Sequence, residues 1–143
     1  MLCNGPDLHL AGDHSIAVDA VLESAGSCAA IWLFWTGEHG GYVVRICQAS
    51  VSLAVDRAPD RRLLGTLSPA RPIELHRPLP VELFARTSRV QVFLDHRYLG
   101  DFSLPAGDPK DGTDALGLSV ESLTGKPPYA VTYANVDVRT YGQ

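Results

Sequence analysis

The segment AAIWLFWT at residues 29–36 is apolar on both faces and is followed by Gly37, Gly40 and Gly41. A strand buried on both sides forms such an unbroken apolar run, and clustered glycines mark the turn after it. Just upstream, residues 16–23 alternate between two faces, which is the period of a half-buried strand. The two segments together predict β-structure with residues 29–36 as a central strand.

Strand patterns continue on the C-terminal side of this segment. Residues 42–48 (YVVRICQ) and 51–56 (VSLAVD) are separated only by Ala49 and Ser50, which predicts a tight hairpin. The remaining strand-like segments are residues 81–87, 90–94, 98–102, 115–123 and 129–141. Asp95 and His96 are expected at the turn between the second and third of these.

The last segment changes parity between Ala134 and Val136, which predicts either a β-bulge or a strand buried on both faces. No stretch shows the i, i+3, i+4, i+7 apolar stripe of a helix. We therefore predict an all-β fold of about nine to twelve strands, arranged as a sandwich or barrel.

Residues 57–80 differ from the rest because they contain Pro59, Pro69, Pro72, Pro78 and Pro80. Proline excludes a helix interior and restricts the residue before it. We interpret this stretch as a proline-rich loop region with short edge strands near residues 63–67 and 73–76. Residues 1–15 are expected to form an N-terminal arm.

Length and charge limit the classes of function. A chain of 143 residues fits one domain, here residues 1–143. With 12 Lys and Arg against 16 Asp and Glu, the net charge of −4 argues against nucleic acid as a partner. No apolar run reaches the length of a membrane span, and the N-terminus lacks the pattern of a signal peptide. We expect either a cytoplasmic protein or a part of a longer extracellular chain.

Three motifs support a closer comparison. They are Val90, Val92, Leu94, Asp95 and Leu99 in a paired-strand unit; Gly112, Gly117 and Leu118 at a strand start; and Tyr133, Asn135, Val136 and Val138 in a closing strand. In this order the chain resembles concanavalin A-like jelly-roll sandwiches, and more closely laminin-G-like domains and related bacterial glucanase-like modules. It departs from their pattern at His96, where glycine is usual, and at Ala134, where aspartate is usual.

The resemblance implies two packed antiparallel sheets, one of them curved into a groove. It does not imply an activity, because the same sandwich serves lectins, glycosidases, laminin modules and interaction domains.

Catalysis is not favoured by the sequence. Glycosidases of this fold carry E-x-D-x-x-E on one strand, since one carboxyl protonates the leaving oxygen while the other attacks, and that motif is missing here. Asp19 and Glu23 form the one same-face pair, which a solvated surface explains. No serine lies in a GxSxG context, and His39 and His96 are interpreted as turn residues. We expect a protein that is not an enzyme.

A saccharide is the first candidate ligand. Sugar binding needs an exposed aromatic face beside planar polar groups. Trp32 and Phe34 are expected on one face of their strand, with Trp35 on the other, so one tryptophan is assigned to the core. The other tryptophan is placed on a concave sheet, where it forms the predicted ligand-binding site with His39, Tyr42 and Arg45. In the alternative interpretation, both tryptophans belong to the core.

Calcium is the one cofactor that the sequence suggests, because Asp108, Asp111 and Asp114 could supply carboxylate oxygens to it. A surface turn also explains this spacing. We interpret Cys3, Cys28 and Cys47 as small buried hydrophobic residues, with Cys28 and Cys47 as the pair to test for a disulfide.

We thus predict a non-catalytic binding module with carbohydrate as ligand. The alternatives are a protein-interaction or sensor domain without a sugar site, including a homodimer through an edge strand, and, third, a glycoside hydrolase-like enzyme.

Overall fold

Every regular element in the described part of the chain is a strand. The computed structural model describes residues 2–4, 13–36, 40–57, 60–86, 88–105 and 115–141. The strands are β1 (Leu2–Asn4), β2 (Asp13–Leu22), β3 (Ser27–Thr36), β4 (Gly40–Ile46), β5 (Val51–Arg57), β6 (Asp60–Leu67), β7 (Leu79–Ala85), β8 (Arg89–Leu94), β9 (Arg97–Ser103), β10 (Ala115–Ser122) and β11 (Val131–Tyr141). None of the described residues belongs to a helix that could cross a membrane.

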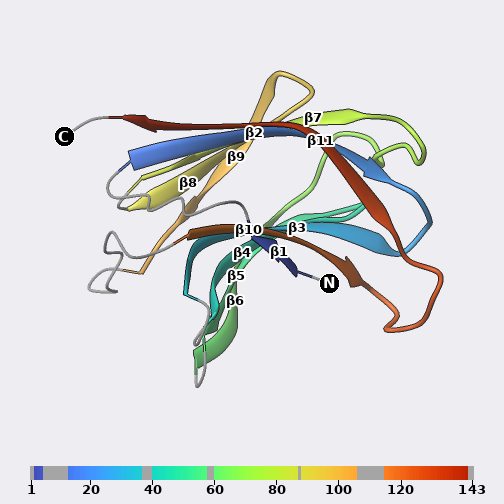
Figure 1. Ribbon diagram of the computed structural model, residues 1–143, viewed down its shortest axis with the longest axis horizontal. Helices are drawn as coiled ribbons and strands as arrows, with labels where there is room; N and C mark the ends of the chain where they lie inside the picture. The colour runs from blue at the N-terminus through green and yellow to red at the C-terminus, as the bar shows by residue number, and fades with distance from the viewer. Residues whose placement is uncertain are drawn as a thin grey trace.

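The strands form two antiparallel sheets that lie one above the other (Figure 1). The six-stranded sheet has the order β1-β10-β3-β4-β5-β6, and the five-stranded sheet has the order β11-β2-β7-β8-β9. The segment of residues 29–36 lies within β3, which pairs with β10 on one side and β4 on the other, so the predicted central strand is confirmed. The predicted jelly-roll sandwich is also confirmed, with β1 formed inside the expected N-terminal arm and β2 starting at Asp13.

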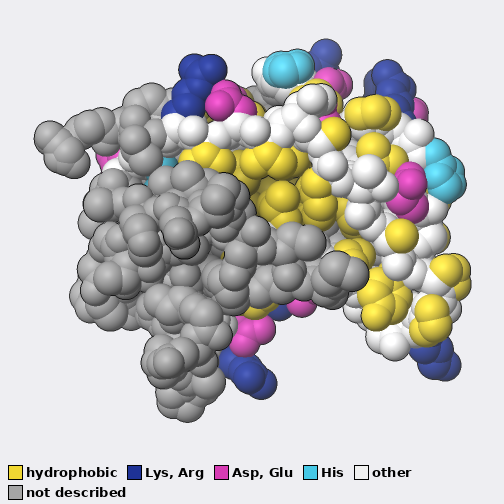
Figure 2. Space-filling view, in the orientation of Figure 1, with side chains coloured by type: hydrophobic (Ala, Val, Ile, Leu, Met, Phe, Trp, Pro, Cys, Tyr) yellow, Lys and Arg dark blue, Asp and Glu magenta, His cyan; other side chains and the backbone are white. Residues whose placement is uncertain are grey.

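The core lies between the two sheets and follows the predicted alternation. In β2, the residues Ile16, Val18, Ala20 and Leu22 are all buried, while Ala17, Asp19 and Val21 between them are partly exposed. Hydrophobic side chains gather between the two layers in the space-filling view, and the charged ones lie toward the outside (Figure 2). Each fully buried aliphatic side chain contributes about 1.5–3 kcal/mol, so this alternation supplies the main driving force for pairing the sheets.

One residue of β3 departs from strict alternation. We expected Phe34 to share a face with Trp32, but Phe34 is 3% exposed and belongs to the core with Ile31 and Leu33. The prediction was wrong because Phe34 has a φ of 50° and the pairing with β4 shifts between Leu33 and Thr36. Such a bulge turns one side chain to the opposite face of the sheet. Trp32 is left on the outer face.

The predicted turn and bulge are both present. Asp95 and His96 have φ values of 52° and 64°, and Leu94 pairs with Arg97 on either side of them. Two successive residues with positive φ are what a tight turn of this hand requires, so His96 takes a conformation that glycine adopts more easily. In β11, the register shifts between Ala134 and Asp137, which confirms the bulge near Val136.

The proline-rich region is partly corrected. The expected short strand at residues 63–67 belongs to β6, which has eight residues and forms the edge of the six-stranded sheet beside β5. Residues 73–76 form no strand, although hydrogen bonds fix this segment at two points. The side chains of Arg61 and Arg62 are exposed and so is Leu63, as expected at a sheet edge.

Cys28 and Cys47, the pair singled out for a disulfide test, are bonded. Both are buried, as expected, and their sulfur atoms form a disulfide. The register explains the bond, because Ala29 pairs with Ile46 and the next residues outward along the two strands are Cys28 and Cys47. Directly opposed positions on neighbouring antiparallel strands place the two side chains on the same face.

A tyrosine side chain links the two sheets. Tyr133 lies on β11 of the five-stranded sheet, and its hydroxyl donates to the carbonyl oxygen of Ser119 at 2.6 Å. The same hydroxyl accepts a hydrogen bond from the backbone N–H of Ala30 at 3.0 Å. One side chain thereby connects β11 with both β10 and β3 at the centre of the opposite sheet.

Tyr133→Phe is expected to lower the free energy of unfolding by about 1–3 kcal/mol, because it removes both hydrogen bonds and leaves their backbone partners unsatisfied. Urea unfolding measures this. Tyr129→Phe is the control, since Tyr129 is 43% exposed, and it should change stability by less than about 0.5 kcal/mol. Equal effects of the two substitutions would contradict the inter-sheet role of Tyr133.

Candidate functional site

The outer face of the six-stranded sheet carries a small apolar cluster. Ala30, Val43 and Ala54 lie side by side on β3, β4 and β5, and Trp32 packs against them. Val43 and Ala30 are 0% exposed although they face away from the main core. An aromatic side chain is therefore present on an outer surface, where it is partly exposed rather than enclosed.

Trp32 is held in place from the neighbouring strand. Its Nε1–H donates to Oγ of Ser119 at 3.0 Å, and Ser119 lies on β10, one residue from the position paired with Ile31. A tryptophan whose only polar atom is already bonded keeps its ring in a fixed orientation. The ring thus forms a prepared surface on this face.

Arg45 lies beside this tryptophan and connects two carboxylates. Its Nε donates to Oε2 of Glu121 at 2.5 Å, and its Nη2 lies 4.0 Å from Oδ2 of Asp56. Arg45 pairs across β3 with Ala30, whose small side chain leaves room for the guanidinium to reach Glu121 on β10. Asp56 in turn binds Nε of Arg61 at 3.1 Å. The four side chains form a row across the sheet in which negative and positive charges alternate, from Glu121 on β10 to Arg61 on β6.

We call this arrangement the Trp32 face; it consists of Trp32, Arg45, Asp56, Arg61, Ser119 and Glu121. A cavity of about 230 Å³ opens beside it, lined by residues of β4, β5 and β6 that include Arg45, Asp56 and Leu63. The two arginines are balanced by two carboxylates, so the row is polar but carries no net charge. Such a row offers donors and acceptors at short intervals and suits a neutral polyhydroxylated ligand better than a charged one.

The structure assembles part of the site predicted from sequence. Trp32 and Arg45 lie on the same face of the six-stranded sheet; the sequence had left open which tryptophan would join Arg45. Tyr42 was predicted wrongly, because it is 0% exposed and packs in the core edge-on to Phe34, with ring centroids 6.1 Å apart. His39 and the side chain of Trp35 lie outside the described residues, so their assignment stays a prediction.

Sequence reasoning missed the polar partners of these two residues. Ser119 and Glu121 are more than seventy positions away in the chain, at separations of 87 and 76 from Trp32 and Arg45. The alternation in ALGLSVES placed both on one face of their strand, but nothing in it indicated that this strand pairs with β3. Asp56 was visible as the polar end of VSLAVD next to the strand of Arg45.

The other candidates do not gather into a second site of the predicted kind. Asp108, Asp111 and Asp114 lie outside the described residues, so calcium at these positions stays a prediction. Among the residues that the structure describes, no three His, Cys, Asp or Glu side chains form a group that could hold a metal ion.

The same-face carboxylates Asp19 on β2 and Glu23 just after it each have a separate partner. Asp19 accepts a hydrogen bond from Nδ2 of Asn135 at 2.7 Å, and Glu23 lies 3.6 Å from Nδ1 of His76. Both side chains are at the surface of the five-stranded sheet, which agrees with the solvated face expected for this pair.

Comparison with solved structures identifies the fold. The carbohydrate binding module CBM66 from Bacillus subtilis matches with a TM-score of 0.72 and 13% identity, over 90% of this chain and 76% of that chain. Sheep galectin-11, solved with glycerol, matches with a TM-score of 0.71 and 14% identity, over 96% of this chain and 95% of that chain. A double variant of human galectin-16 gives a TM-score of 0.68 and 11% identity, over 99% and 95% of the two chains.

The sequence matches no family model and no curated protein. The structural likenesses therefore establish the fold, a two-sheet jelly-roll β-sandwich, at a level of identity where the fold is all that they show. The narrower likeness to concanavalin A-like proteins rests on the sequence motifs. The narrower likeness to laminin-G-like domains stays a prediction.

Proposed function

We propose that this protein is a non-catalytic carbohydrate-binding module that binds a neutral saccharide on the Trp32 face. The observation that carries the proposal is the juxtaposition of a fixed, partly exposed tryptophan with the charge-balanced row of Arg45, Glu121 and Asp56. Support from the fold comes from neighbours described as a carbohydrate binding module and as galectins.

The chemistry of a sugar ring fits this face. A pyranose has an apolar C–H surface that stacks on an indole, and its hydroxyls act as both donors and acceptors. The guanidinium of Arg45 supplies donors, and the oxygens of Glu121 and Asp56 supply acceptors. Because the ion pairs already orient these groups, binding costs little additional side-chain entropy.

The same ion pairs argue against hydrolysis. A glycosidase needs one carboxyl that donates a proton and a second that attacks or activates water. Glu121 and Asp56 are the two carboxylates of the Trp32 face, and each is already engaged by a guanidinium. A carboxylate oxygen bound in this way is a poor proton donor, so we assign these residues to binding.

A glycan array followed by isothermal titration calorimetry tests the proposal. We expect neutral oligosaccharides to bind. Trp32→Ala and Arg45→Gln should each lower the affinity for the tightest-binding oligosaccharide by about tenfold, which is the effect of losing one central binding contact. Each titration is run with calcium and with a chelator, which also tests the predicted calcium site.

Arg89→Gln is the matched control, because Arg89 forms a comparable surface ion pair with Asp101 on the five-stranded sheet. Its affinity should equal that of the unchanged protein, and thermal melting should show all three variants folded. Failure of every saccharide to bind would reject the proposal and favour a protein-interaction domain.

A further inference from the structure

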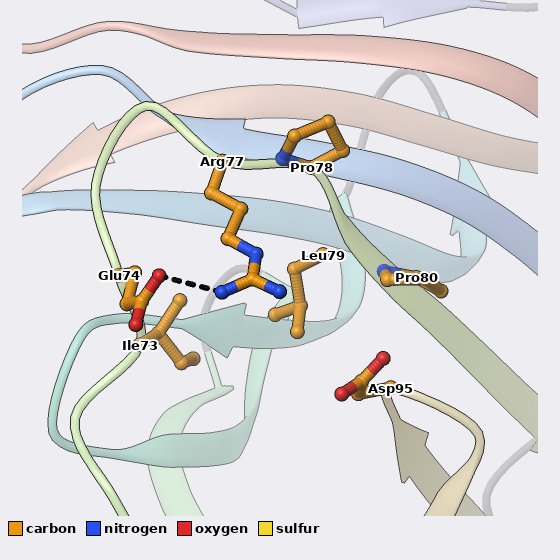
Figure 3. A pocket seen from close by; sticks show the side chains of 7 residues that line it. All are labelled: Ile73, Glu74, Arg77, Pro78, Leu79, Pro80 and Asp95. Atoms are coloured by element: carbon orange, nitrogen blue, oxygen red, sulfur yellow. Dashed lines mark hydrogen bonds and ion pairs between the residues drawn. The ribbon is translucent and has the colours of Figure 1, made fainter.

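A groove lies between the loop that follows β6 and the hairpin of β8 and β9. It encloses about 590 Å³ and is lined by residues that include Arg71, Ile73, Leu79, Asp95, Arg97 and Tyr98, which we call the end groove. A second cavity of about 310 Å³ shares Ile73, Leu79 and Asp95 with it and continues toward Glu74 and Arg77 (Figure 3). The combined space falls in the range of small-ligand sites.

The walls of the end groove are fixed by hydrogen bonds to both sheets. The N–H of Ile73 donates to the carbonyl oxygen of Gln48 at 2.8 Å, and Nε2 of Gln48 donates back to the carbonyl oxygen of Ile73 at 2.8 Å. Across the groove, the N–H of Asp95 donates to the carbonyl oxygen of Pro80 at 2.8 Å. The groove therefore keeps its shape without a ligand, which lowers the entropic cost of binding.

The floor is apolar and one wall is aromatic. Ile73 and Leu94 are 7% and 9% exposed, whereas Tyr98 is 55% exposed. The ring of Tyr98 contacts the ring of Phe93, its partner on β8, with centroids 5.5 Å apart and planes tilted by 57°. An exposed tyrosine that rests on a second aromatic ring presents a rigid surface for stacking.

The charges of the end groove differ from those of the Trp32 face. Neither Arg71 nor Arg97 pairs with any carboxylate that the structure describes. Arg77 is bound by Glu74 at 2.9 Å, and Figure 3 shows its guanidinium lying between Glu74 and Leu79. Two guanidinium groups of the end groove thus have no ion-pair partner within the described part of the chain, although the net charge of the protein is −4.

We propose that the end groove is a second binding site, which takes a saccharide with an anionic group, its ring on Tyr98 and its carboxylate or sulfate between Arg71 and Arg97. Guanidinium groups bind carboxylate and sulfate through paired N–H donors, and both arginines are exposed, so an anionic group can reach them. The site goes beyond the neutral ligand proposed for the Trp32 face and uses none of its residues.

Calorimetric titration of the full chain with three probes tests this site: an oligogalacturonate, a heparin-derived oligosaccharide and a neutral galacto-oligosaccharide of the same length. One of the two anionic probes is expected to bind. Arg71→Gln and Arg97→Gln should each lower the affinity for that probe by about tenfold. Tyr98→Ala should weaken it as well. The two anionic probes distinguish carboxylate from sulfate as the recognised group.

Arg139→Gln is the matched control, because Arg139 is an exposed arginine on β11 that pairs with Asp137. It should leave the affinity unchanged, and so should Trp32→Ala, which separates this site from the Trp32 face. Absence of anionic binding, equal binding of the neutral probe, or an equal loss in Arg139→Gln would each overturn the proposal.

Discussion

Tyr42→Ala is expected to lower the free energy of unfolding by about 3–5 kcal/mol, the usual cost of truncating a buried aromatic side chain. Tyr42 is 0% exposed, and its strand partners Leu33 and Val55 are buried to the same degree. Because these neighbours are fixed on the adjacent strands β3 and β5, they cannot move to fill the space. Since a domain of this kind is stable by about 5–15 kcal/mol, the loss is large.

Urea unfolding followed by tryptophan fluorescence gives the measurement. Leu63→Ala serves as the control, because it truncates a large apolar residue that is 63% exposed on β6, and it should cost less than about 0.5 kcal/mol. If Tyr42→Ala instead left stability unchanged and abolished sugar binding, Tyr42 would be a ligand contact, as first predicted from sequence.

Removal of the Cys28–Cys47 disulfide is expected to cost about 3 kcal/mol, because the bond closes a short loop in the unfolded chain. The two cysteines are 19 positions apart and join β3 to the end of β4. The double variant Cys28→Ala/Cys47→Ala should therefore unfold at lower urea concentration than the oxidised protein, with both forms folded in buffer.

Reduction provides an independent comparison. A reducing agent should destabilise the unchanged protein and leave the double variant unaffected, and alkylation of the oxidised protein under denaturing conditions should modify one cysteine, Cys3. If alkylation modified all three cysteines, the disulfide would be absent. Glu121 pairs with Cys28, so the same samples should be titrated with saccharide to learn whether the bond also positions the Trp32 face.

Most strands could be predicted because their signal is local. The alternation of Ile16 and Val18 with Ala17 and Asp19 reflects one buried and one partly exposed face, and this pattern is present in the sequence before any pairing occurs. The turn at Asp95 and His96 and the bulge near Val136 were local as well. Phe34 was misplaced because its positive φ and the register shift beside it turn its own side chain to the core face, which the local alternation does not indicate.

The candidate site was only half predictable, for a different reason. Trp32 and Arg45 were identified as an aromatic and a charged residue in apolar strands, which is a property of each segment alone. Ser119 and Glu121 became their partners only when β10 paired with β3. Strand order depends on contacts between distant segments, and no local pattern encodes which strand is the neighbour.

The sequence by itself determined the all-β class, the absence of a charge pattern for nucleic acid, and the buried face of strands with an unbroken alternation, such as β2. These properties follow from hydrophobic periodicity and composition, which act over a few residues. The tertiary structure decided that Tyr42 is core and that Cys28 meets Cys47. It also decided that Arg71 and Arg97 border one groove with Tyr98, because register and loop anchoring bring together residues from separate segments.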